Sequence, residues 1–235
     1  MSSPPHPAII ALDGPAGSGK TSTARAVAER LGFVYLDTGA MYRAVTLAAL
    51  DAGAPITDDG LAGVLDATRL EIGYGEGRMA IRLNGEDVSD RIRSGEVGRH
   101  VSPVSALASV RHRMVDMQRA FARAQLVAGR GIVVDGRDIG TVVFPDAELK
   151  VFMSAQPRVR AARRHQELAQ KGDERSLDDV LAEIERRDAM DSARAIAPLR
   201  PAEDAILLDT SGLTMDQQVS FVVNKLSERQ QQSDV

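Results

Sequence analysis

Five short apolar runs divide the chain, and stretches with helical periodicity separate them. The runs are AIIAL (8–12), FVYLD (33–37), GIVVD (131–135), LKVFM (149–153) and AILLD (205–209). Apart from Lys150 and the aspartates that end three of them, the runs are apolar and do not alternate with polar residues, which is typical of strands buried on both faces. We therefore predict an α/β fold with a five-stranded parallel sheet and helices on both of its faces.

The period of the apolar positions changes to two between residues 70 and 83. Leu70, Ile72 and Tyr74 share one face there, as do Met79, Ile81 and Leu83, with a Gly-Glu-Gly turn at 75–77. This pattern predicts a β-hairpin inserted into the α/β core. A long helix is predicted after it, over about 104–128, with its apolar stripe at Leu107, Val110, Met114, Met117, Phe121 and Ala124.

The segment after the first apolar run carries the first chemical signal. It reads GPAGSGKTS, that is Gly14, Pro15, Ala16, Gly17, Ser18, Gly19, Lys20, Thr21 and Ser22. It satisfies GxxxxGK(S/T) between a predicted strand and a predicted helix, a context that argues against a chance glycine-rich turn. Glycines let backbone N–H groups surround a phosphate, Lys20 reaches the β and γ oxygens of ATP, and the Thr21 hydroxyl is offered to Mg²⁺.

Other phosphate-loop classes lack their second motif. A GTPase needs NKxD, but Asn224-Lys225 continues into Leu226-Ser227. Motor and transporter ATPases usually end a core strand in Asp-Glu, whereas Asp135 is followed by Gly136. We therefore set both classes aside.

Composition narrows the remaining choices. The 235 residues carry a net charge of -4 and contain no cysteine. This balance argues against nucleic-acid binding, and the lack of cysteine excludes disulfides and thiolate metal sites. No apolar run is long enough for a membrane helix and no signal peptide pattern is present, so we expect a cytoplasmic protein.

Two strand ends carry residues that could bind the molecule that accepts the phosphoryl group. In LDTGAMYRAV (36–45), Thr38 is predicted as a helix N-cap or as a ligand residue, and Tyr42 and Arg43 follow in the first turns of the helix. After GIVVD, Arg137 and Asp138 stand between two glycines. They form either a surface turn with a solvated ion pair or part of the nucleotide site.

The segment 176–201 replaces apolar positions by charges. Ser176 and Asp179 resemble a capping box, and an apolar stripe follows at Leu177, Val180, Leu181 and Ile184. The same spacing then reaches Arg187, Asp191 and Arg194. Either the helix emerges into solvent with an Arg187–Asp191 pair, or this stripe lines a cleft that holds an anion.

A cluster of arginines follows the fourth apolar run. Arg158, Arg160, Arg163 and Arg164 form either the exposed face of an amphipathic helix or a mobile lid over the transferred phosphoryl group. The charged stretch QKGDERS (170–176) suits a lid loop.

Four of these motifs together resemble the bacterial cytidylate kinases. GPAGSGKT, LDTGAMYRA, DGRDIGTVVFPDA and RRDxxDxxRxxAPL occur in this order, and the resemblance runs from Ile9 to about Val223. It implies the nucleoside monophosphate kinase version of the P-loop fold in a single kinase unit. The implied regions are a core at about 8–37, 130–156 and 195–226, an acceptor region with the β insert at about 38–129, and a lid at about 157–176.

The resemblance also implies residue roles. The loop Gly14–Ser22 with Arg163 and Arg164 would bind ATP, and Lys20, Arg137, Arg187 and Arg194 would be catalytic. The residues implied for CMP are Thr38, Tyr42, Arg43, Ser102, Arg111, Arg137, Asp138, Arg187, Asp191 and Arg194. Family members often have Ser at the position of Thr38, so the hydroxyl is kept.

These roles imply transfer of the γ-phosphoryl group of ATP to CMP or dCMP, with Mg²⁺ as cofactor and a monomer as the working form. Within the base site, an acceptor such as Asp138 suits the N4 amine of cytosine, and Arg111 suits its N3 or O2 acceptors. Two alternatives remain: a P-loop kinase with another small acceptor, such as a sugar, and an ATP-binding regulator without catalysis.

Overall fold

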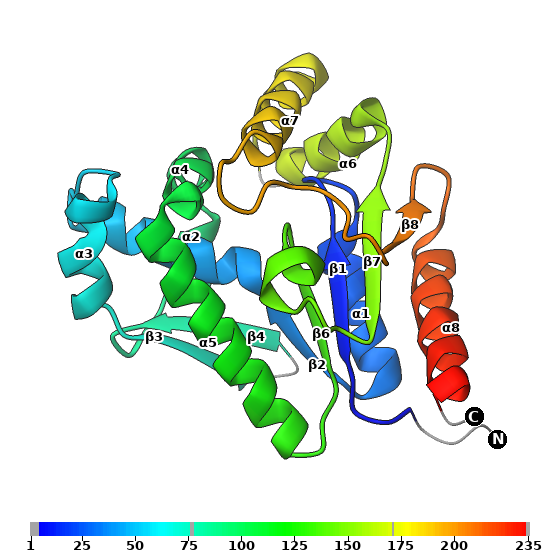
Figure 1. Ribbon diagram of the computed structural model, residues 1–235. Coiled ribbons are helices and arrows are strands. Elements are labelled where there is room, and N and C mark those ends of the chain that lie inside the picture. Colours follow the sequence, from blue (N-terminus) through cyan, green and yellow to red (C-terminus); the bar gives the residue numbers. More distant parts are fainter. Residues whose placement is uncertain (1–4, 76–77, 171, 234–235) are drawn as a thin grey trace. The chain divides into compact units, whose positions relative to one another are not determined.

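The protein is described by a computed structural model that covers residues 5–75, 78–170 and 172–233 (Figure 1). A five-stranded parallel sheet has the order β2 (Val34–Asp37), β6 (Ile132–Gly136), β1 (Ile9–Asp13), β7 (Leu149–Ser154) and β8 (Ile206–Asp209). All five predicted strands are confirmed. The central strand, β1, sets Ala11 opposite Val134 of β6 and Lys150 of β7.

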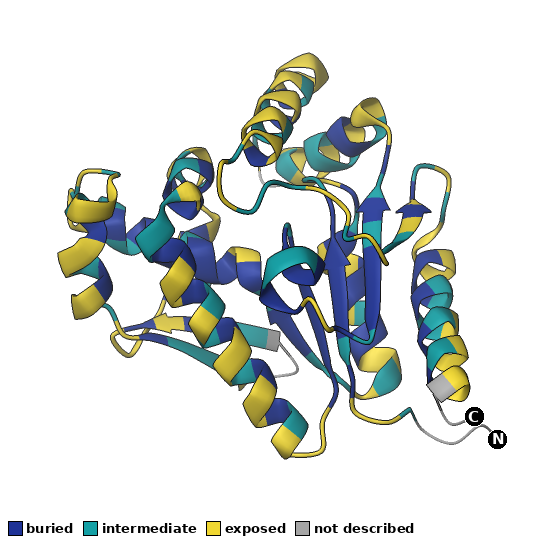
Figure 2. Cartoon of the chain, viewed as in Figure 1, coloured by how far each residue is buried: buried dark blue, intermediate teal, exposed yellow. Residues whose placement is uncertain are grey.

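Helices α1 (Lys20–Leu31) and α8 (Met215–Ser233) cover one face of this sheet. Ile10 and Leu12 of β1 join the core cluster with Val27 of α1 and Val222 of α8. The alternate residues of a strand point to the opposite face, and there Ala11 is also fully buried. The sheet is therefore covered on both faces, as the apolar runs predict (Figure 2).

The remaining elements complete the chain. In order they are α2 (Thr38–Asp51), α3 (Asp58–Ala67), β3 (Leu70–Gly75), β4 (Arg78–Leu83), β5 (Glu86–Asp87), the 3₁₀-helix η1 (Arg91–Arg93), α4 (Gly95–Ala106), α5 (Ala108–Val127), the π-helical turn η2 (Ile139–Val143), α6 (Pro157–Ala169) and α7 (Leu177–Ser192). No helix in the described ranges could cross a lipid bilayer.

Backbone contacts divide the chain into two units, 1–35 with 124–235 and 36–123. The boundaries fall within β2 and α5. The assignment of an acceptor region at about 38–129 and a lid at about 157–176 stays a prediction.

The hairpin is confirmed in the second unit. Leu70 lies opposite Leu83, Ile72 opposite Ile81 and Tyr74 opposite Met79, which is the predicted shared face. Residues 76 and 77 of the predicted Gly-Glu-Gly turn lie outside the described residues. The sequence pattern missed the short third strand, β5, which pairs with β4.

The predicted helix over 104–128 is wrong at its start. Leu107 is extended (φ -68°, ψ 136°) and separates α4 from α5. The carboxylate of Asp58, in α3, accepts the Ser109 N–H at 2.7 Å and so caps the start of α5. This cap comes from a residue far along the chain, so the periodicity could not reveal it. Ala124, predicted on the buried stripe, is exposed, whereas Ala122 and Gln118 are buried.

Candidate active site

The loop between β1 and α1 can be built only with glycine at several positions. Gly14, Gly17 and Gly19 have φ angles of 144°, 76° and 89°, which other residues rarely adopt. A Cβ atom on Gly14 would lie 2.0 Å from the Met153 carbonyl oxygen, and one on Gly17 would lie 3.0 Å from Cβ of Arg160. Gly19 is the N-cap of α1, so Lys20 begins the helix, as the strand–loop–helix motif predicts.

Lys20 lies buried inside this loop, only 5% exposed. Its ammonium donates to the Pro15 carbonyl oxygen at 2.6 Å and to the Ser18 hydroxyl at 3.3 Å. Burial, and then the nearby positive charge of Arg137, hold the pKa of Lys20 well below its usual value; Asp135 and Asp13 oppose this, and Arg187 adds to it. Cations from three segments therefore gather at the loop, where a phosphate would relieve their repulsion.

Asp135 is a site residue that the sequence analysis did not single out. Its carboxylate accepts hydrogen bonds from the Thr21 hydroxyl at 2.7 Å and the Tyr35 hydroxyl at 2.9 Å. Asp135 is followed by Gly136 and so lacks the Asp-Glu pattern, although its place near the end of a core strand was a usable signal. Its oxygens and that of Thr21 are ligands of the type that Mg²⁺ prefers.

Within the described part of the chain, no group of three or more His, Cys, Asp or Glu side chains could hold a metal ion by itself. Mg²⁺ in phosphate-transferring enzymes commonly takes one or two protein oxygens and completes its shell with substrate phosphates and water. The pair of Thr21 and Asp135 fits an ion of that kind.

Asp191 connects two of the predicted arginines. It is 1% exposed, and its oxygens accept hydrogen bonds from Nε of Arg137 at 3.0 Å and from a terminal nitrogen of Arg194 at 2.6 Å. Burial alone would raise the pKa of Asp191, but Arg137, Arg194 and Arg187 together hold it below its usual value. The structure thus brings together four of the residues predicted around the transferred group.

The reading of α7 as a helix that emerges into solvent is wrong, because Asp191 is buried at its last turn. The helix ends at Ser192, so Arg194 lies beyond it and reaches back to Asp191. The predicted capping box of Ser176 and Asp179 is confirmed. Val180 and Ile184 form the buried stripe, whereas Leu177 is exposed.

The reading of Arg137 and Asp138 as a solvated surface turn is also wrong. Asp138 is 4% exposed, and Arg137 is bound to the buried Asp191. Both residues follow the end of β6 and directly precede the η2 turn. Their backbone is therefore set by the strand on one side and by the turn on the other.

The arginines of α6 differ in their burial and in their hydrogen-bond partners. Arg160 is buried and donates to the Ala16 carbonyl oxygen at 3.1 Å and to the Asp188 carboxylate at 2.5 Å, so the exposed-face reading is wrong for it. It ties α6 to the glycine loop and to α7.

The two arginines predicted to bind ATP, Arg163 and Arg164, have different partners. Arg163 donates to the Thr210 carbonyl oxygen at 2.7 Å, and the Thr210 hydroxyl donates to the Ser18 carbonyl oxygen at 2.9 Å. Arg164 instead pairs with the exposed Glu167 at 3.0 Å. The structure therefore connects Arg163, and not Arg164, with the glycine loop. Lys171 of the predicted lid loop lies outside the described residues.

The unit of residues 36–123 holds the other predicted acceptor residues. The N-cap of α2 is Asp37, which accepts the Ala40 N–H at 2.8 Å, so the prediction of Thr38 as the cap is wrong. Thr38 and Tyr42 are both buried on α2. Arg43 donates to the Ile92 carbonyl oxygen at 3.4 Å.

Ser102 and Arg111 are buried in the same unit, on α4 and α5. A Cβ atom on Gly98 of α4 would lie 3.8 Å from a guanidinium nitrogen of Arg43, so Arg43 reaches the helix that carries Ser102. Buried polar and charged side chains are uncommon in a core without a specific reason, which makes all these residues candidates for ligand contacts.

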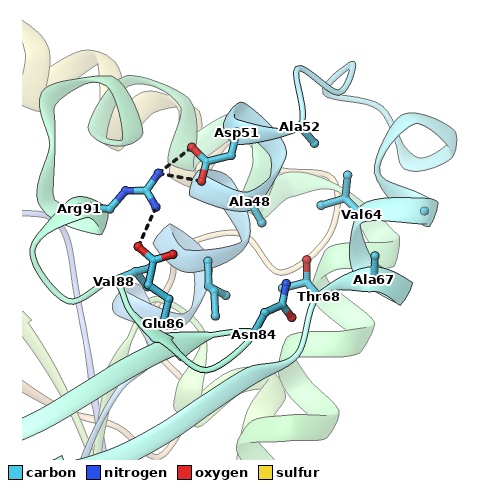
Figure 3. Close-up of a pocket in the computed structure, with 12 residues that line it drawn as sticks. Ala48, Asp51, Ala52, Val64, Ala67, Thr68, Asn84, Glu86, Val88 and Arg91 are labelled. Carbon is cyan, nitrogen blue, oxygen red and sulfur yellow. Dashed lines mark hydrogen bonds and ion pairs between the residues drawn. The ribbon is translucent and has the colours of Figure 1, made fainter.

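A separate cavity of about 480 Å³ lies in this unit (Figure 3). Its lining comprises Ala48, Asp51, Ala52, Gly63, Val64, Ala67, Thr68, Leu83, Asn84, Glu86, Val88 and Arg91. Three of the lining residues are charged: Arg91 forms ion pairs with Asp51 at 2.8 Å and with Glu86 at 3.4 Å. None of the sequence-predicted site residues lines it.

Comparisons with known proteins were made across the whole chain. A family model described as "Cytidylate kinase" matches residues 10–228. A curated cytidylate kinase from Salinibacter ruber is 52% identical over 218 residues, covering 93% of this chain and 96% of the relative. One from Nocardia farcinica is 48% identical over 222 residues, covering 94% and 92%.

Solved structures add a likeness of fold. A crystal structure of an uncharacterized protein from Eubacterium ventriosum superimposes with a TM-score of 0.50 at 11% identity, covering 94% of this chain and 98% of the other.

Proposed function

Because the chain belongs to the cytidylate kinase family, we infer that it transfers the γ-phosphoryl group of ATP to CMP or dCMP, giving ADP and CDP or dCDP. The observation that carries this proposal is the geometry of the site: Lys20 is buried inside the phosphate loop, and the buried Asp191 holds Arg137 and Arg194. A complete phosphate loop beside such a cluster favours a working kinase over a silent ATP-binding regulator. A kinase of another acceptor would leave the proposed base-reading residues without a purpose.

We assign the β- and γ-phosphates of ATP to the loop Gly14–Ser22. Its backbone N–H groups would donate to the phosphate oxygens, and Lys20 would exchange its bonds to Pro15 and Ser18 for these oxygens. Arg163 is assigned to ATP on the strength of its link through Thr210 to the loop. The assignment of Arg164 to ATP has less support, because its described partner is Glu167.

Thr21 and Asp135 would hold Mg²⁺. When bound, the ion neutralises negative charge on the phosphates. The 2.7 Å contact between the Thr21 hydroxyl and Asp135 keeps both oxygens at the start of α1, which supports this assignment.

The acceptor requires no general base, because a CMP phosphate oxygen is already an anion. The task of the protein is to hold two negatively charged groups in line and to neutralise the charge on the transferred group. We assign this to Arg137, Arg187 and Arg194, with Asp191 fixing two of them through contacts of 3.0 Å and 2.6 Å. Asp191 would also reach the ribose hydroxyls. Thr38, Tyr42 and Arg43 would lie in the CMP pocket, with Arg43 on the CMP phosphate.

Base choice is assigned to Ser102, Arg111 and Asp138. An ionised Asp138 only accepts hydrogen bonds and so suits the N4 amine of cytosine, whereas Arg111 only donates and suits N3 or O2. Uracil presents O4 and N3–H instead, so UMP would leave buried groups mispaired at about 1–3 kcal/mol each.

We further propose that α6 and the 170–176 segment act as a lid that excludes water from the γ-phosphoryl group. A cytoplasmic address and a monomeric working form complete the proposal. Sedimentation at micromolar protein concentration tests the monomer.

The deciding experiment offers ATP and Mg²⁺ with a panel of nucleoside monophosphates and small sugars, and measures ADP and the phosphorylated product. We expect CMP and dCMP to be converted at least tenfold better than UMP, by kcat/KM. ADP release that does not depend on any acceptor, or faster conversion of a sugar, would contradict the proposal.

A further inference from the structure

Asp13 is a buried carboxylate that the proposed mechanism does not use. It ends β1 directly before the glycine loop and is 6% exposed. Its Oδ1 accepts the Ile139 N–H at 2.8 Å and its Oδ2 accepts the Gly140 N–H at 2.7 Å. Both oxygens are therefore committed to the backbone of one short segment.

That segment is the η2 turn, Ile139–Val143. The first N–H groups of any helix have no partner within the helix, and Asp13 satisfies two of them here. The residue before the turn, Asp138, has φ -145° and ψ 25°, outside the regular helix and strand regions. Its carbonyl oxygen in turn accepts the Val142 N–H at 2.9 Å.

The turn is also held from a second side. A Cβ atom on Gly140 would lie 3.1 Å from Cδ of Lys150 and 3.4 Å from Oδ2 of Asp13, so the backbone fits closely between the two side chains. The Lys150 ammonium donates to the Pro145 carbonyl oxygen, just after the turn, and to Asp204 at 2.9 Å.

The placement of Asp13 is unfavourable for the carboxylate itself. Burial, opposed by its two backbone hydrogen bonds, raises the pKa of Asp13 to about 6; the charge of Asp138 adds to this and that of Lys20 counters it. If this position only had to fill space in the core, an apolar residue would avoid the cost of burying a carboxylate.

We propose that Asp13 is a positioning residue for the acceptor nucleotide: it fixes the η2 turn and thereby aims Arg137 and Asp138, the residues that directly precede the turn. This inference rests on the proposed function, which assigns the CMP phosphate to Arg137 and the base to Asp138. Because both oxygens of Asp13 already accept backbone N–H groups, the proposal gives Asp13 no contact with either nucleotide.

The test is the isosteric change Asp13→Asn. Asparagine keeps one acceptor oxygen, so one of the two N–H groups faces an amide donor instead. We expect the KM for CMP to rise about tenfold, at the low end of what one buried unpaired donor costs. The CMP-to-UMP ratio of kcat/KM should fall by a similar factor, whereas the KM for ATP should change less than about threefold.

The matched control is Asp87→Asn. Asp87 also accepts a backbone N–H, that of Ser89 at 2.9 Å, but it is exposed and lies outside the proposed site. We expect its kinetic constants to match those of the wild type within about twofold.

A second variant, Gly140→Ala, presses on the same turn from the Lys150 side and leaves Asp13 in place. It should show the same selective loss for CMP, so the inference stays testable even if Asp13→Asn fails to fold. Amide hydrogen exchange at Ile139 and Gly140 should quicken in Asp13→Asn but not in Asp87→Asn.

The outcomes separate this inference from the proposed function. If the wild type makes no CDP, the proposed function fails, and the nucleotide part of the inference fails with it. If the wild type is active but Asp13→Asn and Gly140→Ala raise both KM values equally, or neither, the positioning role alone is overturned.

Discussion

Replacing Asp191 by Asn should destabilise the fold far more than its two ion pairs would suggest on a surface. The Asp191 side chain is 1% exposed and binds Arg137 at 3.0 Å and Arg194 at 2.6 Å. Removing one partner of a buried ion pair typically costs about 3–5 kcal/mol, because the remaining charges stay buried without compensation. Asparagine keeps one acceptor, so we expect a loss of about 3 kcal/mol in the free energy of unfolding.

The chain offers a matched control in Asp216→Asn. Asp216 binds Arg30 at 2.7 Å, a similar distance, but its side chain is 77% exposed. Exposed pairs contribute about 0–1 kcal/mol, so the control should lose no more than that. The two variants then differ in burial and in the number of arginine partners, which is two for Asp191 and one for Asp216.

Urea unfolding followed by far-ultraviolet circular dichroism measures both variants, since the protein contains no tryptophan for fluorescence. The pKa of Asp191 lies below its usual value in the folded state, so its stabilisation is present above the unfolded pKa of about 4 and is lost as the pH falls through the folded value. The gap between wild type and Asp191→Asn should therefore narrow in acid. If Asp191→Asn loses no more stability than Asp216→Asn at pH 7, the reasoning is refuted.

The remaining predictions concern Lys20, Asp138 and Asp13. Lys20→Ala should lower phosphoryl transfer about a hundredfold or more while circular dichroism stays native, because a preorganised donor to the transferred group is lost; wild-type turnover would contradict its role. Asp138→Asn should reduce the preference for CMP over UMP in kcat/KM, and an unchanged ratio would count against base reading. Asp13 has a folded pKa of about 6 against a usual 3.8, so the folded state binds its proton more tightly. As the pH rises from below about 4 to above about 6, this group should lower the free energy of unfolding by about 3 kcal/mol in total, and the pH dependence of Asp13→Asn should lack this decline.

The parts of the fold that follow from local pattern were predictable. All five core strands appear as largely apolar runs without alternation, and the hairpin faces follow from a period of two. The glycine loop was predictable for the same reason, since its function depends on residues that are consecutive in the chain.

The parts that depend on distant partners were not predictable. Asp13 binds amides 126 and 127 residues away, and the hydroxyl of Thr21 reaches Asp135, 114 residues along the chain. The start of α5 depends on Asp58, and the role of Arg160 depends on Ala16 and Asp188. In the sequence, Arg160 looks like the other arginines of its cluster. It differs from them by its burial, which the sequence does not show.

Thr38 shows a smaller limit of the same kind. Asp37 and Thr38 are both good N-cap residues, so sequence preference could not decide between them. The backbone does decide: Asp37 is extended with φ -85° and ψ 94°, and α2 begins one residue later.

Like charges gather around Lys20, so the thermal stability of the protein should depend on the concentration of phosphate-bearing ligands. A ligand that brings phosphate to these cations binds the folded chain and not the unfolded one, so it shifts the folding equilibrium in proportion to the logarithm of its concentration above its dissociation constant. A cell rich in nucleotides would thus hold this enzyme in a sturdier form than a starved cell, and turnover of the protein would follow the supply of its own substrates.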